Sequence, residues 1–157
     1  MLTGALASSY YGRPRTTLDV DVVMSVRRKD LAKLANALTK ANLDVQEERL
    51  LTAWRSEHVI ATVEDRKSPH TLDIMFTDRK LEMRAGHILG VPTWYQSAES
   101  LILAKLRMIK ATLQPERAAT DREDIKAILG TTPINLKTLR KRAGADGTIK
   151  ILDNLNP

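Results

Sequence analysis

Two aspartates, Asp19 and Asp21, lie inside a segment that is otherwise rich in valine. Leu18–Ser25 has the alternation of a β-strand, so the two carboxylates point to the same face. Two like charges on one side of an apolar strand cost free energy unless something neutralises them. An oxygen-preferring divalent cation, Mg²⁺ or Mn²⁺, is the natural partner. This pattern predicts a strand with a metal-binding edge.

A third acid occupies a second strand-like segment. Asp73 interrupts the apolar stretch Thr71–Phe76. If this strand neighbours the first, three carboxylates converge, and such a cluster can hold two metals, one activating an attacking hydroxyl and one steadying a leaving pyrophosphate. The alternative is that Asp-x-Asp arises by chance and that Asp73 simply ends on a sheet face.

The residues upstream indicate an anion site. Gly4 and Ala5 open a predicted helix that extends to Tyr11, and the backbone N–H groups and dipole of a helix start attract phosphate. Small residues are needed there because the backbone itself approaches the ligand. The following turn carries Arg13 and Arg15, which we expect either to clamp phosphate or to be solvated turn residues.

The remaining pattern predicts an α/β (α+β) fold, with a small mixed sheet first and helices last. Residues 1–3 resemble the tail of a strand, and residues 43–54 fit either a strand and loop or a short helix. Further strands are expected at 59–63 and 88–91, and helices at 30–41, 97–113, 120–129, 136–143 and 149–155. We expect an α/β core at 1–95 and a helical C-terminal subdomain at 96–157.

Composition bounds the partners. The chain has 157 residues, no cysteine and a net charge of +6. The basic balance fits a polyanion, either RNA or a nucleotide triphosphate, although solubility alone would also explain it. No apolar run is long enough to cross a bilayer, so no membrane partner and a cytoplasmic location are expected.

The first block of motifs resembles the signature of the DNA polymerase β-like nucleotidyltransferase superfamily, in particular its minimal prokaryotic branch with the AbiEii-type toxins. That signature is an apolar residue, Gly, then Gly or Ser, a spacer, and Asp-x-Asp between apolar residues. Here Ala5 replaces the second small residue. Residues 98–106 are similar to the family's Glu-x-Leu-x-x-x-Lys helix. Residues 120–125 are similar to its Lys/Arg-Asp-x-x-Asp-Ile helix start, with Thr120 in place of the basic residue.

The resemblance implies roles for particular residues. Lys105 would contact the triphosphate or base, Asp121 would orient Lys105 or the acceptor, and Asp73 would be the third, variable carboxylate. From the residues alone, Lys105 could equally be a surface lysine and Asp121 a first-turn acid. The implied metal ligands are Asp19, Asp21 and Asp73, with Lys105 and Asp121 as further catalytic residues. The implied nucleotide-binding residues are Gly4, Ala5, Arg13, Arg15, Thr17 and Lys105.

Three functions follow from these expectations. The first is Mg²⁺- or Mn²⁺-dependent transfer of a nucleoside monophosphate (NMP) from a nucleoside triphosphate (NTP) to RNA, for example tRNA, or to a protein. The second is a catalytically weakened nucleotide- or RNA-binding module of the same fold. The third is the toxin of a toxin–antitoxin system, controlled by a cognate antitoxin protein.

Overall fold

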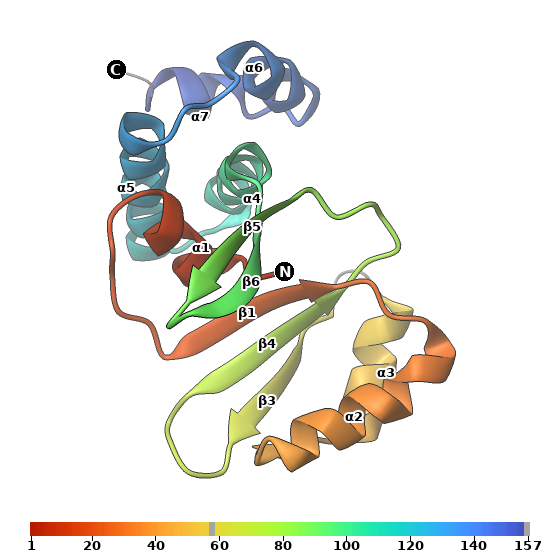
Figure 1. Cartoon of the computed structure of the whole chain (residues 1–157). Helices are drawn as coiled ribbons and strands as arrows, with labels where there is room; N and C mark the ends of the chain where they lie inside the picture. The colour runs from red at the N-terminus through yellow and green to blue at the C-terminus, as the bar shows by residue number, and fades with distance from the viewer. Residues whose placement is uncertain (57–58, 156–157) are drawn as a thin grey trace. The chain divides into compact units, whose positions relative to one another are not determined.

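The computed structural model describes residues 1–56 and 59–155 and divides the chain into two compact units (Figure 1). The sheet unit comprises Met1–Leu6 and Thr16–Tyr95. The helical unit comprises Ala7–Arg15 and Gln96–Pro157. Helix α1 (Gly4–Tyr11) therefore contributes residues to both.

The sheet unit is built on four strands in the order β1-β4-β3-β2. Strands β1 (Asp19–Met24) and β4 (Thr71–Phe76) are parallel neighbours. Strands β3 (Ala61–Asp65) and β2 (Leu43–Asp44) extend the sheet in antiparallel fashion. The mixed sheet and the helices after it confirm the predicted fold class.

One face of this sheet carries the hydrophobic core. Helices α2 (Leu31–Lys40) and α3 (Glu47–Arg55) contribute to that core, and the short 3₁₀ turn η1 (Arg28–Asp30) leads into α2 (Figure 1). Its buried members are Val22, Leu31, Ala35, Leu38, Leu50, Ala53, Ala61, Val63, Ile74 and Phe76. Because strand side chains alternate, burying Val22 and Ile74 turns Asp21 and Asp73 to the opposite face.

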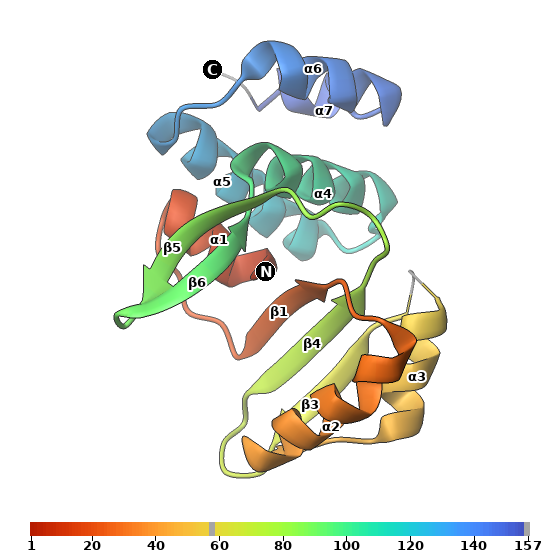
Figure 2. The ribbon, with the colours of Figure 1, turned by 45° about the vertical axis from the view of Figure 1, so that its right-hand side comes forward.

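The start of the chain pairs with β1, as expected for the tail of a strand. Leu2 forms an antiparallel bridge with Val22 and a parallel bridge with Tyr95. Tyr95 belongs to β6 (Val91–Gln96), which pairs with β5 (Met83–Ile88) in a separate two-stranded sheet (Figure 2).

The helical unit is held by a core of aliphatic side chains. Its helices are α4 (Ala98–Ala111), α5 (Pro115–Thr131), α6 (Leu136–Ala145) and α7 (Ile149–Asp153), seen in Figure 2. Ser97 caps α4 by accepting a hydrogen bond from the Ser100 amide, as predicted. The fully buried side chains of these helices include Leu101, Ile102, Leu106, Ile125, Ile128, Leu139 and Leu152. No helix among the described residues is long and apolar enough to span a membrane.

Three predicted elements need correction. The strand expected at 88–91 is instead the turn of the β5–β6 hairpin. Leu89 and Gly90 have φ of 48° and 81°, the left-handed pair that a two-residue hairpin turn requires. Pro92 is the second residue of β6, a strand of a two-stranded sheet, and a missing N–H is tolerated at such a position.

The helix expected from residue 120 begins five residues earlier. Pro115 occupies its first turn, where the missing N–H costs nothing. Thr120 is therefore inside α5 and donates to the Glu116 carbonyl rather than capping. Leu113, expected on the buried stripe of the preceding helix, is 98% exposed because α4 ends at Ala111.

Candidate functional site

The face of the sheet opposite the core is acidic. Asp21 and Asp73 are directly paired in the register of β1 and β4, and Asp19 pairs with Thr71 two residues earlier. Residues two apart on a strand share a face, so all three carboxylates emerge on one side of two adjacent strands. Strands lie about 4.8 Å apart, so Asp21 and Asp73 are close like charges, which is an unfavourable arrangement by itself.

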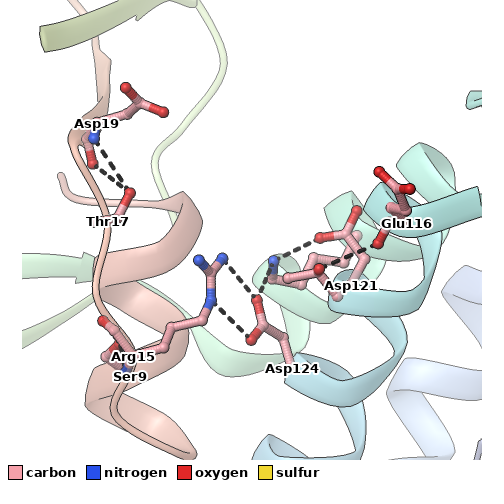
Figure 3. A network of polar contacts seen from close by, with 9 residues as sticks. Ser9, Arg15, Thr17, Asp19, Glu116, Asp121 and Asp124 are labelled. Atoms are coloured by element: carbon pink, nitrogen blue, oxygen red, sulfur yellow. Dashed lines mark hydrogen bonds and ion pairs between the residues drawn. The ribbon is translucent and has the colours of Figure 1, made fainter. Parts of the chain in front are cut away.

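Two threonines hold the outer carboxylates of this face. The Thr71 hydroxyl donates to Asp19 Oδ1 at 2.8 Å. The Thr62 hydroxyl, from the directly paired position on β3, donates to Asp73 Oδ1 at 2.7 Å. Thr17, predicted to touch nucleotide, bonds the Asp19 backbone at 3.2 Å through its hydroxyl (Figure 3). These contacts restrict the orientation of the acids at both ends of the row.

Gly4 lies against the central acid. Its φ is +57°, and a Cβ built there would sit 1.9 Å from Asp21 Oδ2. The Thr3 amide also donates to the Asp21 carbonyl at 2.9 Å. Only glycine lets the backbone come this close in this conformation, so the start of α1 is placed beside the Asp21 carboxylate.

The donor set of the acidic face has the chemistry that Mg²⁺ and Mn²⁺ prefer. Its ligands are all carboxylate oxygens, and the strand register places two of them side by side. Within residues 1–56 and 59–155, however, no three His, Cys, Asp or Glu side chains are gathered closely enough to form a ready-made ion site. Asp21 and Asp73 are the two acids of this face that the strand register pairs directly.

A hollow lies between α3 and the start of β3. It has a volume of about 350 Å³ and reaches Thr62, the residue that holds Asp73. The other lining residues are Glu48, Arg49, Thr52, Val59 and Ile60. The hollow is thus partly apolar and carries charge of both signs.

The helical unit contains a second polar cluster, in which Lys105, Asp121 and Asp124 are buried and Arg15 is exposed. Lys105 on α4 is 6% exposed, and its ammonium lies 2.8 Å from both Asp121 Oδ1 and Asp124 Oδ2 on α5. Arg15 Nε donates to Asp124 Oδ1 and Arg15 Nη2 donates to Asp124 Oδ2, both at 3.2 Å (Figure 3). Two cations thus balance two carboxylates within one unit. We call these four residues the Lys105 network.

Asp124 is the member of this network whose ionisation is shifted. Burial alone would raise the pKa of its carboxyl, but hydrogen bonds from Lys105 and Arg15 and their positive charges outweigh burial. The pKa of Asp124 therefore lies below its ordinary value, and the residue stays ionised at neutral pH.

The remaining predicted nucleotide-binding residues are placed individually. Arg13 is exposed in the turn after α1, whereas Ala5 is 5% exposed in its first turn. Arg15 also contributes its backbone, since its N–H donates to Ser9 Oγ at 3.2 Å.

Asp124 is the site residue that sequence reasoning did not single out. Asp124 belongs to the segment 120–125, which resembles a helix start of the superfamily. Its spacing of three residues from Asp121 puts both acids on one side of a helix. That spacing was the available signal. The partnership with Arg15, 109 residues away, had no local signature.

Comparisons with known proteins point to one fold. No family model and no curated protein matches the chain. Among solved structures, the chain is similar to the crystal structure of an antigenic nucleotidyltransferase-like protein from Paracoccidioides brasiliensis. The TM-score is 0.60 at 18% identity, over 95% of this chain and 83% of that one. At this identity the likeness concerns the fold, so the chain has a nucleotidyltransferase-like fold.

Proposed function

We propose that this chain is a divalent-metal-dependent nucleotidyltransferase that moves an NMP from an NTP to an acceptor hydroxyl on RNA or on a protein. A bond forms between the acceptor oxygen and the α-phosphorus, and the bond from that phosphorus to pyrophosphate breaks. The superfamily resemblance, the nucleotidyltransferase-like fold and the acidic face support this proposal.

The residues of the acidic face have distinct parts in the proposed reaction. Asp19, Asp21 and Asp73 would hold Mg²⁺ or Mn²⁺, which when bound neutralises charge on the phosphates. Asp73 would also accept the proton lost by the acceptor hydroxyl. Thr62 already occupies its Oδ1, so Oδ2 is the oxygen for that proton.

The backbone at the start of α1 would receive phosphate. The dipole of a helix start attracts anions, and Gly4 brings this helix start next to Asp21. Arg13 is exposed and able to add a positive charge. Lys105 and Asp121 would serve the nucleotide as the resemblance implies, with Asp121 orienting Lys105 through the 2.8 Å contact.

The observation that carries the proposal is the direct pairing of Asp21 with Asp73 on one sheet face beside Gly4. The test incubates the protein with labelled NTPs, Mg²⁺, and either total RNA or a protein lysate. We expect label transfer that Asp21→Asn lowers by about a hundredfold or more. Asp44→Asn is the matched control, because Asp44 lies in the same sheet but pairs with Glu64 on β3. Transfer that is equal in the wild type and in Asp21→Asn would refute the proposal.

A non-catalytic nucleotide- or RNA-binding module is the second candidate. The buried Ala5 favours it, because the second small residue of the motif here has no hydroxyl to offer phosphate. Calorimetry separates the two functions. RNA binding without Mg²⁺-dependent NTP binding would support the module, whereas Mg²⁺-dependent NTP binding lost in Asp21→Asn would support the enzyme.

A toxin whose activity is controlled by an antitoxin protein is a more specific form of the enzyme proposal. It rests on the resemblance to the AbiEii-type branch. Growth arrest on expression that disappears in Asp19→Ala would support it, and harmless expression of an active wild-type enzyme would contradict it.

A further inference from the structure

The positive charge of the chain is unevenly divided between its two units. The sheet unit carries 12 Lys and Arg against 12 Asp and Glu, whereas the helical unit carries 13 against 7. The whole net charge of +6 therefore belongs to the helical unit, although the metal-binding acids proposed above lie in the other one.

Within the helical unit, the excess lies at the surface. In the Lys105 network, two cations and two carboxylates neutralise one another. Outside this network the helical unit has 11 basic and 5 acidic side chains. Several of those acids are already neutralised. Asp146 pairs with Arg107 at 2.7 Å, Glu123 with Lys126 at 3.1 Å, and Asp153 with Arg140.

Helix α6 concentrates this excess on one face. Leu139 and Ala143 are buried, so the opposite side points outward. That side carries Lys137 and Lys141, one turn apart, with the small exposed residues Thr138, Gly144 and Ala145 beside them. The exposed Arg140 next to them is paired with Asp153. The helix contains no acidic residue, and neither lysine forms a salt bridge with a described residue. Lys150 on the adjacent α7 is also exposed. We call Lys137, Lys141 and Lys150 the α6–α7 lysines.

We propose that the helical unit binds the phosphate backbone of RNA through the α6–α7 lysines. This inference rests on the proposed function, because it selects RNA rather than protein as the acceptor. Single lysines spaced along a helix suit a chain of phosphates, whereas a lone triphosphate needs charges that converge on one point. Flanking small residues let a backbone approach the helix closely. A membrane-surface helix would carry large apolar residues beside its lysines. Leu136, 41% exposed, is the one exposed large apolar side chain within the described α6 and α7.

The experiment compares two variants that change the net charge equally. One carries Lys137→Glu, Lys141→Glu and Lys150→Glu. The control carries Lys29→Glu, Lys33→Glu and Lys40→Glu, all exposed residues of the sheet unit. Both fall from +6 to zero, so a general charge effect weakens them alike. The probe is fluorescein-labelled bulk tRNA, followed by anisotropy between about 50 and 200 mM salt.

We expect the α6–α7 variant to lose about tenfold or more in affinity for tRNA, while the control loses about threefold or less. The slope of log affinity against log salt concentration should become less steep by about 2 in the α6–α7 variant. Circular dichroism checks that both variants are folded. If the triple variant is unfolded, tRNA binding is measured instead for the milder double variant Lys137→Gln/Lys141→Gln. Equal weakening of the two triple variants would overturn the inference. The inference would also be overturned if the wild type binds phosphatidylserine vesicles more tightly than tRNA and the α6–α7 variant loses both kinds of binding.

Metal binding separates this inference from the proposed function. Mn²⁺ binding, measured by electron paramagnetic resonance, depends on the acidic face and should be unchanged in the α6–α7 variant. If the wild type binds no Mn²⁺ but tRNA binding still depends on the α6–α7 lysines, the enzyme proposal fails and the RNA surface stands. If Mn²⁺ binds and transfer to a protein acceptor survives in the variant at the wild-type rate, the enzyme stands and the RNA inference fails.

Discussion

In the sheet unit, Asp21 and Asp73 lie directly opposite each other, whereas in the helical unit Asp121 and Asp124 share the ammonium of Lys105. In the first pair, Asp21 lies beside Gly4 and Asp73 accepts a hydrogen bond from the Thr62 hydroxyl. The second pair is met by two cations and is almost fully buried. Two like charges side by side lower the stability of the fold, and a bound cation would offset that loss. In a balanced buried network, removing one partner leaves an uncompensated charge and lowers the stability of the fold.

The proposed chemistry and the ionic stabilisation of the fold therefore belong to different clusters of acids. The Lys105 network satisfies its own charges, so any contact of Lys105 with nucleotide must compete with two carboxylates. On the acidic face, the printed contacts of Asp19 and Asp73 are to neutral threonine hydroxyls. Removing one charge should therefore lower stability in the Lys105 network and leave it unchanged or raise it on the acidic face.

The largest effect is expected from Lys105→Met. It removes the cation from two buried carboxylates and should lower the free energy of unfolding by about 3–5 kcal/mol. Urea denaturation measures the change. The exposed Lys110→Met is the matched control, expected to stay within about 1 kcal/mol. A loss under about 1 kcal/mol for Lys105→Met would erase the distinction between the two regions.

A smaller loss is expected from Gly4→Ala. The left-handed conformation costs about 1–2 kcal/mol for a residue with a Cβ, and the new methyl group would displace the Asp21 carboxylate. We expect reduced thermal stability together with weaker Mn²⁺ binding. Gly144→Ala is the control, because a Cβ there meets nothing within 4 Å and α6 should gain up to about 1 kcal/mol. Unchanged Mn²⁺ binding in Gly4→Ala would show that Gly4 does not place the acid.

Asp73→Asn should leave stability unchanged or raise it by up to about 1 kcal/mol. The substitution removes a like charge opposite Asp21, and an amide oxygen can still accept the Thr62 hydrogen bond. The gain should be largest at low ionic strength, where repulsion is least screened. Thermal unfolding at two salt concentrations measures it. A clear loss of stability would mean that the carboxylate is already compensated in the folded protein.

The smallest effect is a difference in pH dependence. The pKa of Asp124 is lower in the folded protein than the ordinary value of 3.8, so its ion pairs stabilise the fold above that value. This contribution is lost as the pH falls through the lowered pKa. The stability difference between wild type and Asp124→Asn should thus be constant near neutral pH and shrink below about pH 4. Urea titrations across this range test it, and a constant difference down to pH 2 would contradict the shift.

Local sequence patterns predicted many of the strands and helices. The alternation of Val20 and Val22 against Asp19 and Asp21 follows from the period of a strand, and the Ser97 cap follows from a residue type at a helix start. The helix boundaries around Pro115 were wrong. A proline can end one helix or begin the next, and its neighbours do not distinguish the two.

The amino-acid sequence by itself determined that Asp19 and Asp21 share one strand face and that Asp121 and Asp124 share one helix face, because both relations depend only on backbone period. Tertiary structure alone decided that Asp73 stands opposite Asp21, that Gly4 touches the same carboxylate, and that Arg15 reaches Asp124. These contacts depend on strand register and on packing between residues far apart in the chain. Side-chain periodicity carries no information about either.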